Sequence, residues 1–181
     1  MYNYIIVISQ LMKGWIILIA LACDHGGFKL MREVRDYLDE LGHDYKDFGT
    51  FSEDSCDYPD IAVSAARAIA DGECVNGIFI CGTGIGMGIV ANKIEGIRAA
   101  LCSDCYSAEM ARRHNNANVL TLGERVVGAG LAIKIVEVFL NTGFDGGRHG
   151  HRVDMIKALD ANRSALFDEG TAGGVGDYRQ G

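Results

Sequence analysis

The chain has 181 residues, 49% apolar and 23% charged, a composition that suits one globular domain with a substantial core. Its formal charge of −7 argues against a broad nucleic-acid-binding surface, which would need an excess of lysine and arginine. Six scattered cysteines do not suit a disulfide-rich secreted module, so we expect free thiols in the cytoplasm.

The N-terminal segment over residues 4–22 is mostly apolar, but Ser9, Gln10, Lys13 and Gly14 interrupt it. A membrane helix needs about 20 nearly continuous apolar residues, and a signal peptide needs a preceding basic region. The segment meets neither requirement, so we expect no membrane partner. We divide the chain into an N-terminal extension (1–14), one domain (15–160) and a flexible, polar, glycine-rich C-terminal tail (161–181).

Strands and helices alternate along this domain. Short apolar runs predict strands, and apolar residues at helical spacing predict helices. The predicted strands are 15–22, 43–48, 77–81, 96–101 and 117–122. The predicted helices are 28–41, 60–70, a short one ending near 92, 104–114, 128–140 and 153–159. This order predicts an α/β fold with a five-stranded parallel sheet between two layers of helices, and ligands beyond the carboxyl ends of the strands.

The strongest local signal follows the third predicted strand, where Cys81 precedes glycines at 82, 84, 86 and 88. Glycines let the main chain approach a ligand, and a helix N-terminus offers free N–H groups to negative charge. The spacing excludes the dinucleotide fingerprint G-x-G-x-x-G, Met87 excludes a phosphatase-type C-x5-R loop, and the G-K-[ST] of a P-loop is absent. We therefore favour a cysteine base for proton transfer through an enediolate over a buried cysteine before a tight turn.

Two further segments carry groups suited to sugar chemistry. After the first strand, the Asp24 carboxylate is suited to orienting hydroxyls and His25 to holding phosphate, although Asp24 as a helix cap is the alternative. His114 and Asn115 lie between a helix and the fifth strand, where they also suit the simple ending of a helix.

A basic segment over residues 144–152 places Arg148 and Arg152 on one helical face, where two guanidiniums suit a phosphate dianion. A solvated basic helix start is the alternative interpretation. Cys102 and Cys105 have C-x2-C spacing, but no second pair is suitably placed, so we expect no metal site.

Together these segments resemble the family of ribose-5-phosphate isomerase B and galactose-6-phosphate isomerase. No single segment is specific, but the combination is, and it runs in order from about residue 17 to residue 159. The matching segments are 22–26, 49–50, 57–60, 80–86, 91–93, 96–100, 114–116, 123–128 and 146–149, with Arg152.

The resemblance implies a Rossmann-like α/β/α enzyme that forms a homodimer, with a tetramer as the alternative, and that needs no metal or organic cofactor. It implies interconversion of ribose 5-phosphate and ribulose 5-phosphate, with Cys81 as the base, Thr83 at the oxyanion, and His114 opening the furanose ring with help from Asp24. The substrate-binding residues that it implies, partly across the dimer, are Asp24, His25, Gly82, Thr83, Gly84, Ile85, Gly86, Asn115, Arg125, Arg148 and Arg152.

Three alternatives stay open at this point. The first is an isomerase of a six-carbon aldose phosphate, such as allose 6-phosphate or galactose 6-phosphate. The presence of Cys81 favours the pentose-type mechanism, because family members without this cysteine use a different base. The second is a non-catalytic sugar-phosphate-binding protein, and the third, a nucleotide-dependent oxidoreductase, is disfavoured by the glycine spacing.

Overall fold

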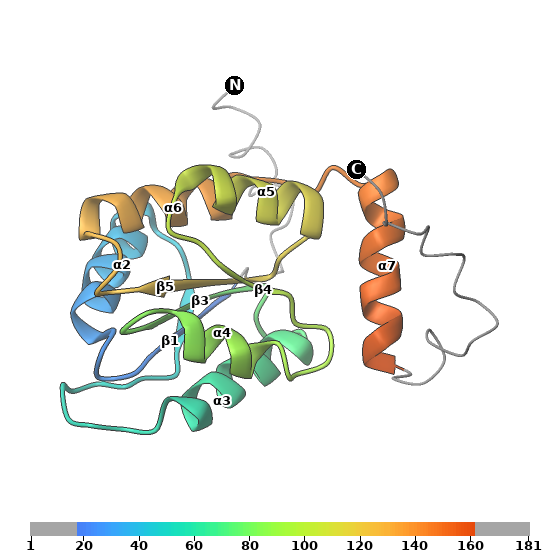
Figure 1. Ribbon diagram of the computed structural model, residues 1–181. Coiled ribbons are helices and arrows are strands. Elements are labelled where there is room, and N and C mark those ends of the chain that lie inside the picture. The colour runs from blue at the N-terminus through green and yellow to red at the C-terminus, as the bar shows by residue number, and fades with distance from the viewer. Residues whose placement is uncertain (1–17, 162–181) are drawn as a thin grey trace, which may run out of the picture.

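The computed structural model describes residues 18–161, so the predicted extension and nearly all of the predicted tail lie outside it. Five strands form one sheet, all of whose pairings are parallel, in the order β2-β1-β3-β5-β4 (Figure 1). The strands are β1 (Ile19–Cys23), β2 (Tyr45–Asp47), β3 (Asn76–Cys81), β4 (Ala99–Leu101) and β5 (Val119–Gly123). The predicted five-stranded parallel sheet is confirmed.

Helices cover both faces of this sheet, as the alternation of elements predicts. The helices are α2 (Phe28–Leu41), α3 (Tyr58–Ala70), α4 (Ile85–Ala91), α5 (Cys105–Asn115), α6 (Ala129–Asn141) and α7 (Arg148–Ala161). Helices α2, α5 and α6 lie on one face and α3 and α4 on the other (Figure 1).

The central strand β3 shows how the two cores are built. Its successive side chains point to opposite faces, so Ile78 and Ile80 pack under α2, α5 and α6, whereas Phe79 and Cys81 pack under α3 and α4. Because both faces are covered, the strand is apolar along its length. The last residue of the strand, Cys81, therefore lies on the face of the sheet that α4 covers.

Strand β4 is shorter than its sequence suggests. We predicted a strand over 96–101, but the paired part begins at Ala99. Gly96 has a φ of 80°, which no strand residue adopts. The main-chain N–H of Arg98 donates to the Asn118 side chain (2.8 Å), so it does not join the ladder.

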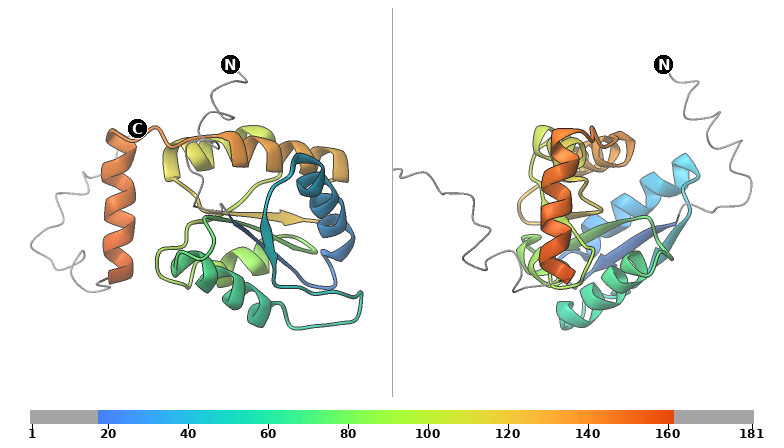
Figure 2. Two further views of the ribbon diagram at one scale, coloured as in Figure 1. Left: turned by 180° about the vertical axis from the view of Figure 1, so that it is seen from behind. Right: turned by 90° about the vertical axis from the view of Figure 1, so that its right-hand side faces the viewer.

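Helix α7 begins five residues earlier than the predicted helix over 153–159. Gly146 and Gly147 have φ of 65° and 54° and turn the chain immediately before it, and the N–H of His149 donates to the Gly146 carbonyl (3.0 Å). The helix stands beyond the amino ends of the strands, apart from the two helical layers (Figures 1 and 2). At its far end the Asp160 carboxylate accepts the N–H of Gly96 (3.0 Å).

Candidate active site

Three neighbouring strand ends meet at the carboxyl edge of the sheet. The register sets Cys23 of β1 beside Ile80, and Cys81 of β3 beside Gly123 of β5. The Cys81 side chain is 5% exposed, and its Sγ accepts a hydrogen bond from the N–H of Gly84 at 3.1 Å. The sulfur thus lies at the foot of the glycine loop that the sequence singles out.

The glycine loop between β3 and α4 packs closely against the end of β5. Gly84 has a φ of 77°, and a Cβ on it would lie 2.8 Å from the carbonyl carbon of Leu122. On the opposite side, a Cβ on Gly123 would lie 2.7 Å from the Cα of Thr83. Because neither position has room for a side chain, both glycines are needed for the close approach of these two strand ends.

Asp24 and His25 join the same edge through the loop between β1 and α2. Asp24 is 7% exposed, and its Oδ1 accepts the N–H of Gly26 (2.9 Å). A Cβ on Gly26 would lie 3.2 Å from the nitrogen of Gly82, so this loop touches the glycine loop. His25 Nδ1 accepts the N–H of Cys56 (3.3 Å), which leaves Nε2 as the protonated nitrogen of the neutral ring.

Two more side chains border the glycine loop. The Arg125 guanidinium lies against Gly82, because a Cβ there would be 3.4 Å from Arg125 Cζ. The Tyr58 ring lies over Gly86, where a Cβ would be 3.1 Å from the Tyr58 hydroxyl oxygen. Tyr58 falls within the matching segment 57–60, but no role was predicted for it. Its position next to a proline at the start of a helix was the available signal.

The remaining predicted site residues lie at the opposite, amino edge of the sheet. His114 and Asn115 end α5 directly before β5 begins, and β5 starts beside Gly77 at the start of β3. Arg148 and Arg152 lie in the first turns of α7, which stands beyond this edge (Figure 1). The six residues of β3, rising about 3.3 Å each, separate the two edges by about 17–20 Å. One chain therefore does not bring Cys81 together with His114.

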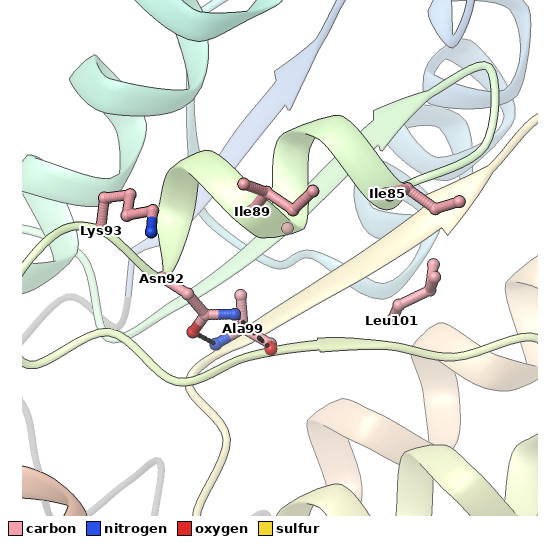
Figure 3. A pocket seen from close by; sticks show the side chains of 7 residues that line it. Ile85, Ile89, Asn92, Lys93, Ala99 and Leu101 are labelled. Carbon is pink, nitrogen blue, oxygen red and sulfur yellow. Dashed lines mark hydrogen bonds between the residues drawn. The ribbon is translucent and has the colours of Figure 1, made fainter.

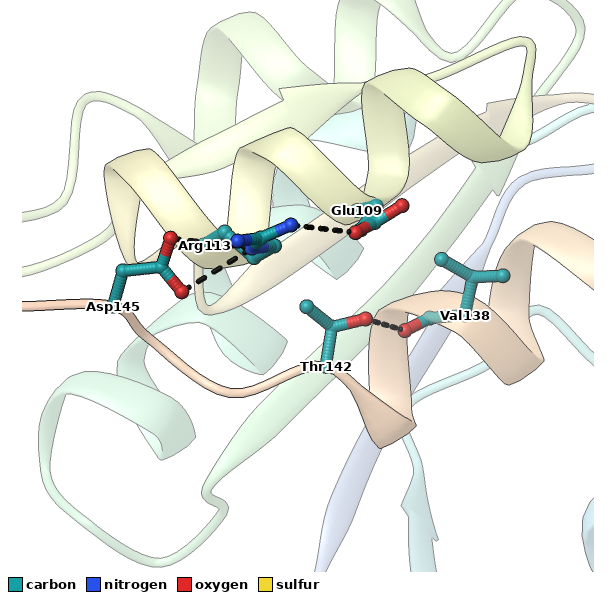
Figure 4. A network of polar contacts seen from close by, with 5 residues as sticks. All are labelled: Glu109, Arg113, Val138, Thr142 and Asp145. Atoms are coloured by element: carbon teal, nitrogen blue, oxygen red, sulfur yellow. Dashed lines mark hydrogen bonds and ion pairs between the residues drawn. The ribbon is translucent and has the colours of Figure 1, made fainter.

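At the amino edge, α5 is joined to the segment that leads into α7 (Figure 4). Arg113 donates through Nε to both oxygens of Asp145 (3.2 Å each) and through Nη1 to Glu109 (3.0 Å). The Thr142 hydroxyl donates to the Val138 carbonyl (2.6 Å) and closes the end of α6. These contacts fix where the chain leaves α6 and approaches α5.

His114 and the residue that follows Arg148 form a close pair. The His114 and His149 rings are stacked, with centroids 4.2 Å apart and planes inclined by 4°. Within residues 18–161, neither Arg148 nor Arg152 has a carboxylate partner. Two guanidiniums one helical turn apart, without a carboxylate to neutralise them, present a binding surface for an anion.

Three of the other cysteines are unsuited to proton transfer near neutral pH. Burial raises the pKa of the Cys23 thiol to about 12 and that of Cys102 to about 11, against an ordinary value of 9.0. Burial also raises the pKa of Cys74. All three lie in the protein interior, so they act as small apolar side chains.

An open groove of about 400 Å³ lies between α4 and the edge strand β4 (Figure 3). Ile85, Ile89 and Leu101 line it and are 52, 58 and 49% exposed. The Asn92 side chain exchanges two hydrogen bonds with the main chain of Ala99 along the groove (2.9 and 2.8 Å). The groove does not include Cys81, but Ile85 continues the glycine loop directly, so the two features are adjacent.

Over the part of the chain that the structure describes, no three metal-binding side chains gather in one place. No helix in that same part combines the length and apolar character needed to cross a bilayer.

Comparison with known proteins gives consistent matches over this domain. The profile of the ribose/galactose isomerase family matches residues 19–156. The chain is 49% identical to ribose-5-phosphate isomerase B of Escherichia coli, covering 81% of this chain and 98% of that protein. It is 45% identical to a D-erythrulose-4-phosphate isomerase of Pectobacterium atrosepticum, covering 76% and 91%. The solved ribose-5-phosphate isomerase B of Clostridium thermocellum superposes with a TM-score of 0.80 at 50% identity, covering 81% and 99%.

Proposed function

The chain belongs to the ribose/galactose isomerase family, and we propose that it interconverts ribose 5-phosphate and ribulose 5-phosphate with Cys81 as the base. The observation that carries this proposal is the position of the Cys81 sulfur. It ends the central strand, accepts the Gly84 N–H and lies where the loops after β1, β3 and β5 meet. An aldose–ketose isomerase needs a base and several hydrogen-bond donors around one carbon skeleton, and this edge offers both.

The proposed chemistry is a pair of proton transfers. Cys81 removes the proton from C2 of the open-chain aldose, and the charge passes to O1 as an enediolate forms. The same proton is returned to C1, while the proton of the C2 hydroxyl passes to O1, which gives the ketose. A positioned base contributes about 10²–10⁴-fold to such a step. The reaction only moves protons, so it calls on no cofactor.

The oxyanion requires donors that are already in place. Thr83 and the main-chain N–H groups of Gly82, Ile85 and Gly86 are the proposed donors, while the Gly84 N–H donates to the Cys81 sulfur. The close contact of the loop with β5 holds these groups in place. Removing one such donor from an enzyme costs about 10²–10³-fold in kcat. Asp24, next to Gly82, is proposed to orient the sugar hydroxyls and to assist ring opening.

The other half of the proposed site comes from a second copy of the chain. His114, Asn115, Arg148 and Arg152 lie at the amino edge, so a partner must carry its amino edge to this chain's carboxyl edge. His25 would then share the substrate phosphate with the partner's guanidiniums, while the partner's His114 opens the furanose ring. Arg125 and Asn115 complete the proposed substrate contacts.

The groove along α4 and β4 supports a homodimer. It is apolar, open and next to the glycine loop, and exposed apolar surface of this kind marks contact sites. A partner bound in this groove would cover Ile85, Ile89 and Leu101 and lie beside the glycine loop. Pairing of two such dimers into a tetramer remains the alternative assembly.

A coupled assay that follows ribose 5-phosphate and ribulose 5-phosphate tests this function. We expect turnover by the wild type and a loss of about 10²-fold or more in Cys81→Ala. Cys74→Ala, which removes another buried thiol, is the matched control and should retain most activity. Full turnover by Cys81→Ala would reject the assigned base.

The same assay separates the alternative functions. We expect a higher kcat/KM for ribose 5-phosphate than for allose 6-phosphate or galactose 6-phosphate. Thermal stabilisation by ribose 5-phosphate without turnover of any of these sugars would instead identify a non-catalytic binding protein.

A further inference from the structure

The rings of His114, at the end of α5, and His149, in the first turn of α7, are stacked on each other. The centroids lie 4.2 Å apart and the planes are inclined by only 4°. Within residues 18–161, no hydrogen bond reaches the His114 ring. The stacked face of His149 is therefore in a position to set the plane of the His114 ring.

Four features of the chain bring His149 to this position. Arg113, which precedes His114, holds the Asp145 carboxylate with both oxygens at 3.2 Å (Figure 4). The N–H of Asp145 donates to the Arg113 carbonyl (3.0 Å). Gly146 and Gly147, both with positive φ, then reverse the chain and start α7 over the end of α5.

The geometry also indicates that His149 is the neutral partner of the stack. Arg148 Nε donates to His149 Nε2 (3.4 Å), and a guanidinium can donate only to a nitrogen that carries no proton. Partial burial lowers the pKa of His149, and the nearby charges of His114, Arg148 and Arg152 lower it further, while Asp145 acts in the opposite direction. A second positive ring would repel a charged His114 at this distance, whereas a neutral ring tolerates it.

We infer that His149 is a positioning residue, whose neutral ring holds the His114 imidazole in the orientation that opens the furanose ring. This inference rests on the proposed role of His114 in the isomerase reaction. His149 itself need not touch the substrate, and it acts through the plane that it imposes on His114. A misplaced catalytic group can lower the rate by about a hundred-fold. Removal of the His149 ring is therefore expected to lower kcat, although His149 takes no part in the proton transfers.

A double-mutant cycle on ribose 5-phosphate turnover tests this role. We expect His149→Ala to lower kcat about ten-fold or more, and His114→Asn to lower it further. If His149 acts through His114 alone, the double variant loses no more than about two-fold beyond His114→Asn. His149→Phe, which keeps a flat ring, should recover most of the lost activity. Asp154→Asn, which removes an exposed charge elsewhere on α7, is the control and should match the wild type.

Two outcomes would overturn the inference. Losses that multiply in the double variant would mean that His149 acts on the substrate or on folding independently of His114. Wild-type kcat in His149→Ala would mean that the stack has no role.

An NMR measurement separates this inference from the proposed function. In the wild type, the His114 ring protons should shift upfield because they face the His149 ring, and the shift should vanish in His149→Ala and persist in His149→Phe. If the wild type turns over no sugar phosphate, the proposed function fails, and the absence or persistence of this shift still decides whether His149 orients His114.

Discussion

The Glu124 carboxylate accepts a 2.9 Å hydrogen bond from the main-chain N–H of Leu30, which lies 94 positions earlier in the chain. Leu30 is in the first turn of α2, where N–H groups have no partner within the helix. The capping residue of this helix is Gly27, whose missing side chain cannot serve them. From the loop after β5, the Glu124 side chain accepts one of these N–H groups in place of a capping side chain. The main-chain N–H of Glu124 donates to the Cys81 carbonyl (3.0 Å). One residue thus ties α2 to the strand that carries the proposed base.

Glu124→Ala should lower the free energy of unfolding by about 0.5–2 kcal/mol, the usual cost of losing a helix N-cap. Glu124→Gln keeps an acceptor oxygen and should lose less. Urea denaturation of the purified variants measures both. The control is Glu40→Ala at the other end of α2, which should change stability by no more than about 0.5 kcal/mol. Equal stability of Glu124→Ala and the wild type would contradict the capping role.

The stability of the fold should decrease in alkaline solution because of buried thiols. Burial raises the pKa of Cys23 to about 12 from the ordinary 9.0 that an exposed thiol would have in the unfolded chain. Above about pH 9, the unfolded chain therefore releases this proton while the folded chain keeps it, so unfolding becomes more favourable as the pH rises. Below about pH 9 both states hold the proton and the effect is absent.

Urea denaturation at pH 7.5 and at about pH 10 tests this linkage. The wild type should be less stable at the higher pH, and Cys23→Ala should show a smaller difference between the two, whatever its absolute stability. An unchanged difference would assign the alkaline loss to other groups, such as Tyr37 and Tyr45, whose pKa values burial also raises.

The sequence alone predicted the layers, the parallel sheet and the glycine loop, because those depend on local patterns of apolar residues and glycines. The order of the elements in the sequence also implied that Cys81 and His114 lie at opposite edges of the sheet. His114 comes before β5 whereas Cys81 ends β3, and in a parallel sheet those two positions belong to opposite edges. The stack of His149 on His114 could not be predicted, because it depends on the φ values of two glycines and on the ion pair between Arg113 and Asp145, which lie 32 residues apart in the chain.

Replacing the ring-opening residue should affect substrates according to whether they form a ring. We expect His114→Asn to lose about 10²-fold or more in kcat/KM on ribose 5-phosphate. A four-carbon aldose 4-phosphate cannot close a furanose ring, because the phosphate occupies the oxygen that would close it. Its conversion, measured relative to the wild type, should therefore decrease much less. Equal losses on both substrates would exclude ring opening as the role of His114.

A charge in the groove between α4 and β4 should separate the subunits. Ile89→Glu places a carboxylate at a position that is 58% exposed in the single chain, and desolvating it against a partner is costly. We expect a monomer by light scattering, with a native circular dichroism spectrum and little isomerase activity. Leu41→Glu, at a similarly exposed position (54%) at the end of α2, should remain dimeric and active. An active monomer of Ile89→Glu would contradict a shared site.

Mixing two inactive variants tests the central claim most directly. Cys81→Ala lacks the proposed base and His114→Asn lacks the ring-opening group, so each homodimer has two defective sites. After unfolding and refolding together at equal amounts, half of the dimers contain one chain of each kind. Each mixed dimer has one site with Cys81 from one chain and His114 from the other, so about one quarter of wild-type activity should return. Activity that stays at the average of the two separate variants would show that the two residues do not serve one site across a dimer.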